Sequence, residues 1–274
     1  MNAPKLTIEE PFLSLWAGRD PFVAVEALKG EVFRELEARR TLRTEAGGRA
    51  FFVKIHRGVG WGEILKNLLS GRLPVLGAGN EWQAIKRLAS LGVDTMHGVA
   101  FGQRGNNPAT QHSFIVTEEL ASTISLEDYC RDWKQKAPPV AFKHALIGRV
   151  ADMARRMHRG GVNHRDFYIC HFLLHLDPEP TPDNFKLSMI DLHRAQIREE
   201  TPRRWRDKDL SSLYFSALNI GLTQRDKLRF LRAYFAAPLR EIFKNEAPLL
   251  AYLVREASRL QARYLRKYAK SDER

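Results

Sequence analysis

The chain is poor in cysteine and in long apolar runs. Its 274 residues include two cysteines, Cys130 and Cys170, which excludes a disulfide-rich scaffold and indicates a reducing compartment. No stretch approaches the roughly 20 apolar residues that cross a bilayer, and the N-terminus lacks the pattern of a signal peptide. We therefore expect a cytoplasmic protein that reaches a membrane only peripherally.

The sequence also lacks a balance of charge. It has 44 Lys and Arg against 32 Asp and Glu, a net charge of +12, which indicates an anionic partner. Its aromatic residues are dispersed in apolar segments and not interleaved with Lys and Arg as nucleic-acid stacking platforms require. We therefore expect no nucleic acid, and the partners that remain are an anionic membrane surface, an anionic glycolipid or an acidic protein.

Two aspartates are the most informative residues present. Asp166 ends the run Asn163-His164-Arg165-Asp166, and Asp191 follows later in the chain. The residues between them, 172–176 and 186–190, read as two short strands joined by a Pro- and Asp-rich turn, so a hairpin would bring the carboxylates together. Phosphoryl transfer needs one carboxylate beside the acceptor hydroxyl and another on the Mg²⁺ that bridges the ATP phosphates. This pattern predicts a catalytic His164-Arg165-Asp166 group and a metal-binding Asp191.

A lysine lies in the apolar strand predicted for 51–55. Lys54 is there either a snorkelling side chain at a sheet edge or the ammonium that binds the α- and β-phosphates of ATP. Glu81 opens a predicted helix, capped by Asn80, and is the candidate partner of Lys54, because a partly buried cation is costly unless paired. As an alternative, Glu81 is only a favourable first-turn charge on the helix dipole.

The rest of the nucleotide site is less distinct because no Gly-x-Gly-x-x-Gly occurs before Lys54. We expect the phosphate-covering loop at 29–35, with Gly30 as its glycine, although a plain hairpin would look the same. The segment 118–122 is expected to connect two lobes. Glu118 and Leu120 in that segment are assigned to the ATP site.

The order of these residues resembles the protein-kinase-like superfamily, and the stretches 51–62, 163–174 and 190–195 resemble the lipopolysaccharide core heptose kinases of the WaaP type. The resemblance implies an α+β, bilobal, protein-kinase-like fold. A small antiparallel β-rich lobe would span 1–120 and a larger, mostly helical lobe 121–274. It also implies ATP and Mg²⁺ as cofactors and a heptose hydroxyl of the lipopolysaccharide inner core as acceptor.

His171 departs from the ordinary protein-kinase pattern, since a second metal-binding Asn usually stands there. Neutral imidazole prefers softer ions to Mg²⁺. His171 is therefore either a weak metal ligand beside Asp191 or a side chain that bonds to the loop backbone.

Two other functions remain open at this point. A protein Tyr or Ser/Thr kinase would carry an Ala-Pro-Glu segment after Asp191, and the chain has only Glu199-Glu200-Thr201-Pro202 there. A non-catalytic kinase-like binding module would typically lack one of the key charges, and all are present.

Basic residues toward the C-terminus point to the acceptor. Helices are predicted at 207–220, 223–236 and 247–269. The last would carry an apolar side and a basic side, which is typical of a helix on an anionic membrane or of an ordinary lobe helix. Its apolar residues are Leu249, Leu250, Leu253, Leu260 and Tyr264, and its basic residues are Arg255, Arg259, Arg263, Arg266, Lys267 and Lys270. A second basic cluster, expected at the acceptor, consists of Arg194, Arg198, Arg203, Arg204, Arg206 and Lys208.

Overall fold

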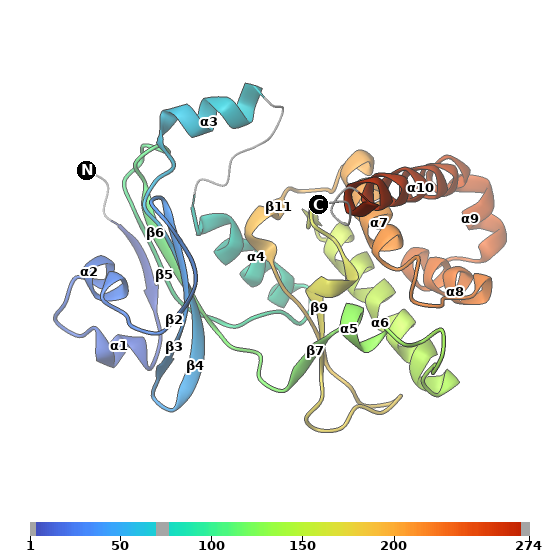
Figure 1. Cartoon of the computed structure of the whole chain (residues 1–274), viewed down its shortest axis with the longest axis horizontal. Coiled ribbons are helices and arrows are strands. Elements are labelled where there is room, and N and C mark those ends of the chain that lie inside the picture. Colours follow the sequence, from blue (N-terminus) through green and yellow to red (C-terminus); the bar gives the residue numbers. More distant parts are fainter. Residues whose placement is uncertain (1–3, 70–76, 270–274) are drawn as a thin grey trace. The chain divides into compact units, whose positions relative to one another are not determined.

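The structure, a computed structural model, describes residues 4–69 and 77–269. These residues form two compact units (Figure 1). The first unit comprises Met1–Lys86, Met96–Leu120 and Leu192–Arg194, and the second comprises Arg87–Thr95, Ala121–Asp191 and Ala195–Arg274. The first unit thus extends beyond the simple division at residue 120 by a short segment after Asp191, and it loses the segment 87–95.

The first unit is built on a six-stranded antiparallel sheet with the strand order β1-β5-β6-β4-β3-β2. The strands are β1 (Lys5–Ile8), β2 (Glu31–Leu36), β3 (Arg39–Ala46), β4 (Arg49–His56), β5 (Gly98–Arg104) and β6 (His112–Glu118). Side chains alternate between the two faces of a strand. In β4 the buried Phe51, Val53 and Ile55 therefore face one side, and Lys54 faces the other.

Two short helices cover the apolar face of this sheet. They are α1 (Phe12–Leu15) and α2 (Pro21–Glu26), the second capped by Asp20, whose carboxylate accepts from the N–H of Phe22 at 2.9 Å. Their aromatic rings contact those of the strands edge to face. The ring centroids of Phe12 and Phe51 lie 4.9 Å apart, and those of Phe22 and Phe114 lie 5.3 Å apart. The sequence did not predict these helices. They fill one face, so that the face with Lys54 remains for α4 (Gly79–Ser90), where Trp82 stacks on Phe101 of β5.

The second unit is mainly helical. Its helices are α5 (Leu126–Tyr129), α6 (Val140–Arg159), α7 (Arg203–Ser216), α8 (Gln224–Phe235), α9 (Leu239–Asn245) and α10 (Ala247–Ala269). Its strands are β7 (Thr123–Ser125), β8 (Val162–Asn163), β9 (Phe172–His175), β10 (Leu187–Met189) and β11 (Gln196–Ile197), with the pairings β10-β9-β7 and β11-β8. Within the described residues, no helix of either unit is long and apolar enough to cross a membrane.

Most predicted elements are present with shifted ends. The hairpin expected at 172–190 is confirmed by the antiparallel pairing of β9 with β10. Ser125 caps α5, its hydroxyl accepting from the N–H of Asp128 at 3.1 Å. Asn80 is not a cap, because α4 already begins at Gly79. The helix expected at 207–220 is α7, and α9 was not expected.

A glycine sets the path of the backbone toward the predicted catalytic residues. Gly161 follows α6 with φ +80°, and a Cβ there would lie 1.9 Å from the carbonyl oxygen of Arg198. Only glycine permits this conformation and this close approach of two backbones. The chain can therefore turn directly from α6 into β8 and the run that begins at Asn163.

Candidate active site

Asp209 of α7 holds the backbone of the predicted catalytic run, residues 163–166. Its carboxylate is 1% exposed and accepts hydrogen bonds from the backbone N–H of His164 at 2.7 Å and of Arg165 at 2.9 Å. Bonds from N–H groups to a buried carboxylate are stronger than neutral ones. They fix the backbone immediately before Asp166.

A buried histidine steadies Asp209 from the other side. Nε2 of His158 lies 3.3 Å from the Asp209 carboxylate and must donate to it, so Nδ1 accepts from the Tyr234 hydroxyl at 2.8 Å. Burial raises the pKa of Tyr234, which keeps the hydroxyl protonated and able to donate. Asp209 therefore joins α6, α7 and α8 to the catalytic run.

Ile190 couples the two predicted catalytic aspartates. Its N–H donates to the carbonyl of His171 at 2.9 Å, and its carbonyl accepts from Nε2 of His164 at 2.9 Å. Burial lowers the pKa of His164, so the imidazole is neutral near pH 7 and can donate from one nitrogen only. The residue before Asp191 is thus held from both sides by the segment that contains Asp166.

This arrangement corrects the catalytic assignment of His164. The side chain is 0% exposed and cannot touch a substrate, so His164 is a positioning residue. The guanidinium of Arg165 lies 5.9 Å from the ring centroid of Trp205, which also indicates a role in holding the loop. Asp166 stays the predicted proton acceptor.

The backbone is strained immediately before Asp166 and at Asp191. Arg165 has φ +74° and Asp191 has φ +63°. Non-glycine residues rarely adopt this region, at a cost of roughly 1–3 kcal/mol each, and they persist where the surroundings impose them. Here Asp209 and the contacts of Ile190 impose them.

His171 bonds to the loop and also faces Asp191. Its Nδ1 lies 2.6 Å from the carbonyl oxygen of Asp166 and must donate to it, while Nε2 lies 3.5 Å from a carboxylate oxygen of Asp191. Without a second proton, Nε2 presents a lone pair to the carboxylate. A positive charge shared by the two atoms, either a proton or a metal ion, would make this contact favourable.

In the first unit, Lys54 and Glu81 form the expected ion pair. Lys54 Nζ and Glu81 Oε1 lie 2.7 Å apart, with the glutamate side chain 2% and the lysine side chain 18% exposed. The other oxygen of Glu81, Oε2, is buried without a hydrogen-bond partner. The helix-dipole alternative does not account for this burial, because a charge that serves only the dipole has no need to leave water.

The phosphate-covering loop was predicted wrongly. Residues 31–36 form β2, and the turn of the hairpin lies at Glu37 and Ala38. A Cβ on Gly30 would lie 1.9 Å from the carbonyl oxygen of Arg43, so the glycine allows close packing against β3 and is not needed for a phosphate loop. The assignment of Gly30 to the ATP site stays a prediction.

The remaining nucleotide residues lie at the end of the first unit. Glu118 ends β6, and its carboxylate pairs with Arg49 and lies 3.4 Å from His97. Leu120 is the last residue of this part of the unit. Their assignment to ATP stays a prediction.

The arginines expected at the acceptor divide into two groups. Arg206 is 16% exposed and pairs with Glu246 at 2.9 Å, and Arg198 donates to the side chain of Asn163 at 2.6 Å, so both hold the second unit together. Arg203 and Arg204 are exposed, and although Arg203 also lies 3.3 Å from Glu246, both stay candidates for the acceptor.

The cysteines do not supply a nucleophile. Burial raises the pKa of Cys130 to about 12 and that of Cys170 to about 11. Both are thiols near neutral pH, and the thiolate is the reactive form.

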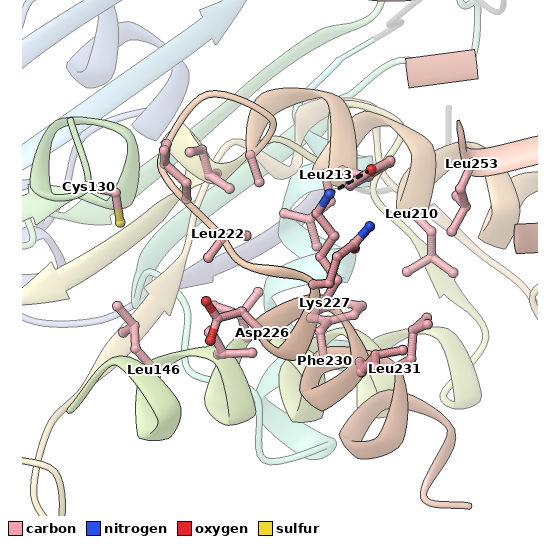
Figure 2. Close-up of a pocket in the computed structure, with 18 of the residues that line it drawn as sticks. Cys130, Leu146, Leu210, Leu213, Leu222, Asp226, Lys227, Phe230, Leu231 and Leu253 are labelled. Atoms are coloured by element: carbon pink, nitrogen blue, oxygen red, sulfur yellow. Dashed lines mark hydrogen bonds between the residues drawn. The ribbon is translucent and has the colours of Figure 1, made fainter. Parts of the chain in front are cut away.

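The second unit also contains an apolar cavity of about 310 Å³ (Figure 2). Its walls come from α5, α6, α7, α8, α9 and α10 and include Leu146, Leu213, Leu231 and Leu253. Its few polar residues include Lys227, which donates to the Tyr214 hydroxyl at 3.1 Å. The volume lies at the lower end of the range for ligand pockets.

Comparisons with known proteins agree with this geometry. Residues 23–234 match the model of the lipopolysaccharide kinase (Kdo/WaaP) family. The chain belongs to this family. It is 65% identical over 259 residues to the lipopolysaccharide core heptose(I) kinase WaaP of Pseudomonas aeruginosa, covering 94% of this chain and 97% of that protein. It is 57% identical over 260 residues to the kinase of that name from Escherichia coli K12, covering 95% and 98%.

A solved structure described as WaaP in complex with acyl carrier protein resembles this chain with a TM-score of 0.84 and 60% sequence identity. The match covers 93% of this chain and 99% of the chain in that solved structure. The expected α+β, protein-kinase-like fold is therefore confirmed, as is the expectation of an ATP-dependent phosphotransferase.

The sequence did not single out Asp209, His158 or Tyr234. Asp209 follows Arg206-Asp207-Lys208 and reads as part of a solvated, charged helix face. Only its burial reveals its role. The one available signal was its place one turn before the apolar end of α7.

If Glu81 acts only through Lys54, then Lys54→Ala and Glu81→Gln should each lower kcat/KM by at least about 10²-fold, and the double variant should be no worse than the worse single variant. Steady-state kinetics with ATP would measure this. Glu63→Gln is the matched control, because Glu63 is half exposed and lies 3.8 Å from Lys66. Losses that multiply in the double variant would contradict the account.

Proposed function

We propose that this chain transfers the γ-phosphate of ATP to a heptose hydroxyl of the lipopolysaccharide core. The relatives named lipopolysaccharide core heptose(I) kinase WaaP are 57–65% identical to this chain over nearly its whole length. The observation that carries the proposal is the coupling of Asp166 to Asp191 through the hydrogen bonds of Ile190 and Asp209. A fixed carboxylate pair of this kind is what phosphoryl transfer requires.

Each residue has a defined part in this proposal. Lys54 binds the α- and β-phosphates, and Glu81 orients it. Asp166 takes the proton from the heptose hydroxyl as it attacks. His164, Arg165 and Asp209 hold the loop and do not touch the reacting atoms.

Asp191, with His171 beside it, fits a divalent cation. Across the described part of the chain, no cluster of three or more His, Cys, Asp or Glu side chains is placed to hold a metal. Two protein ligands suffice for Mg²⁺ in such enzymes, since phosphates and water supply the others. We propose Asp191 as the oxygen ligand and His171 as a weaker nitrogen ligand. The bound ion would neutralise charge on the phosphates.

Asp166→Asn should lower kcat on the heptose acceptor by about 10²-fold or more and leave ATP affinity nearly unchanged, because only the proton acceptor is lost. The measurement compares turnover of ³²P-labelled ATP on delipidated core oligosaccharide with calorimetric ATP binding. Asp183→Asn, in the exposed turn between β9 and β10, is the control. An Asp166→Asn enzyme with full activity would refute the role of Asp166. Labelling of bulk protein but not of the oligosaccharide would favour the protein-kinase alternative.

We further propose that the chain binds an acyl carrier protein, an acidic partner. The solved relative described above is a complex of WaaP with acyl carrier protein. Residues 224–266 contain ten Lys and Arg and four Asp and Glu. Among them Arg225, Arg232, Arg240 and Lys244 are exposed, on helices that also line the apolar cavity. Charge complementarity of this kind favours rapid association with an acidic protein.

The cavity supports an acyl group as part of that ligand. Its lining is almost wholly apolar, and Phe243 and Val254 of the lining are 48% and 59% exposed, so the cavity opens at the surface of α9 and α10. An alkyl chain that enters leaves water at a gain of about 0.8 kcal/mol per methylene. The basic helices would bind the carrier while the cavity binds its acyl chain.

Leu253→Trp should fill part of the cavity. Excluding even two methylenes would cost about 1.6 kcal/mol, a loss of roughly 15-fold in affinity for the acylated carrier. Leu265→Trp on the same helix is the control, because Leu265 is 59% exposed and does not line the cavity. Calorimetric titration with acylated and unacylated carrier would measure both. Equal affinity of the native chain for the two carriers would contradict the acyl site.

The proposed acceptor is attached to lipid, so we also propose that the enzyme associates peripherally with an anionic membrane. The sequence left open whether α10 lies on the membrane or packs as an ordinary lobe helix, and the burial of its leucines favours the second. Leu249 of α10 is 3% exposed, and Leu250, Leu253 and Leu260 are partly buried, so these leucines pack within the second unit, whereas Tyr264 on the same side is 51% exposed. The basic Lys270 lies outside the described residues.

A further inference from the structure

Helix α3 (Gly60–Leu69) separates apolar from polar residues around its axis. At about 100° per residue, its apolar side chains occupy a continuous arc of roughly 140°, and its polar side chains occupy the opposite side. The polar side chains that the structure describes are those of Glu63 and Lys66. In order around the axis, the apolar residues are Ile64, Leu68, Trp61, Leu65 and Leu69.

The apolar arc of α3 faces solvent. Trp61 is 55%, Leu65 54%, Leu68 50% and Leu69 90% exposed, whereas Ile64 is 5% exposed. Ile64, at one edge of the arc, is the single buried residue among the helix side chains that the structure describes. Figure 1 shows α3 beyond the end of the sheet of its own unit. Ordinary surface helices show the opposite arrangement, with the apolar face inward.

The geometry points to α3 as an interfacial helix that lies in the surface of an anionic membrane, with Trp61, Leu65, Leu68 and Leu69 inserted among the lipids. The inference rests on the proposed function, because an acceptor attached to lipid requires the enzyme to work at a membrane surface. Amphipathic helices with Trp and Leu on the apolar face bind in this way. Tryptophan is favoured at the membrane–water interface.

Charge favours the membrane over a protein as the occupant. The chain as a whole carries a net charge of +12, which attracts it to anionic lipids. An acidic protein would instead need basic residues at the contact itself, and α3 has Lys66 alone. An apolar face without local basic residues fits lipid acyl chains, with the wider charge of the protein supplying the attraction.

The test uses the full chain and vesicles of phosphatidylcholine with and without phosphatidylglycerol. The double variant Leu65→Ser/Leu69→Ser should bind phosphatidylglycerol vesicles at least tenfold more weakly in a flotation assay. The matched control is Leu13→Ser/Leu15→Ser in α1, whose leucines are 55% and 50% exposed in the same unit. It should bind as the native chain does. Trp61 fluorescence should shift to the blue on binding and be quenched by brominated lipids, and Trp61→Phe should lose this signal.

The outcomes separate this inference from the proposed function. Phosphorylation of delipidated core oligosaccharide should be unchanged in Leu65→Ser/Leu69→Ser, while phosphorylation of vesicle-bound lipopolysaccharide should fall. Vesicle binding equal to that of the native chain would overturn the inference, even if the kinase is active. A dimer in sedimentation equilibrium that the same substitutions abolish would also overturn it, in favour of a second copy. Failure of the native chain on both acceptors would instead refute the proposed function.

Discussion

The arrangement of the second unit depends on one buried carboxylate. Asp209 accepts from two consecutive backbone N–H groups of the catalytic run and from His158, and it is 1% exposed. Without it, two donors would be left unsatisfied in a dry interior, at about 1–3 kcal/mol each. The same bonds hold Arg165 at φ +74°, a conformation that the free chain would not keep. The strain near Asp166 is therefore maintained by helices far along the sequence.

The buried charges of the two units are held in different ways. Glu81 in the first unit is 2% exposed and has one cation, Lys54, within 2.7 Å. Such a pair stabilises folding little, because both charges lose their water. We interpret it as a positioning device for the lysine ammonium. In the second unit, the carboxylate of Asp209 is satisfied mainly by backbone N–H groups, so it fixes a loop and not a side chain.

The sequence predicted what depends on local pattern. The strand with Lys54, the hairpin after Asp166 and the paired Glu81 follow from alternation, turn residues and the need to pair a cation. It missed what depends on burial between distant segments, such as Asp209, and the close approach of Gly30 to the backbone of Arg43. It left open whether α10 lies on a membrane or packs as an ordinary lobe helix, and it did not single out α3. An amphipathic pattern is the same whether its apolar face packs on helices or on lipid, and only the exposed fractions distinguish the two.

Amide hydrogen exchange of His164 and Arg165 tests the central claim most directly, because these N–H groups lie outside helices and regular strand pairs. If the Asp209 carboxylate holds them, they should exchange as slowly as the amides of α6. Exchange of the Glu179 and Asp183 amides, in the exposed turn between β9 and β10, should be fast. Asp209→Asn, which lacks one acceptor oxygen, should release at least one of the two amides. Exchange of both amides in the native protein as fast as in that turn would contradict the account.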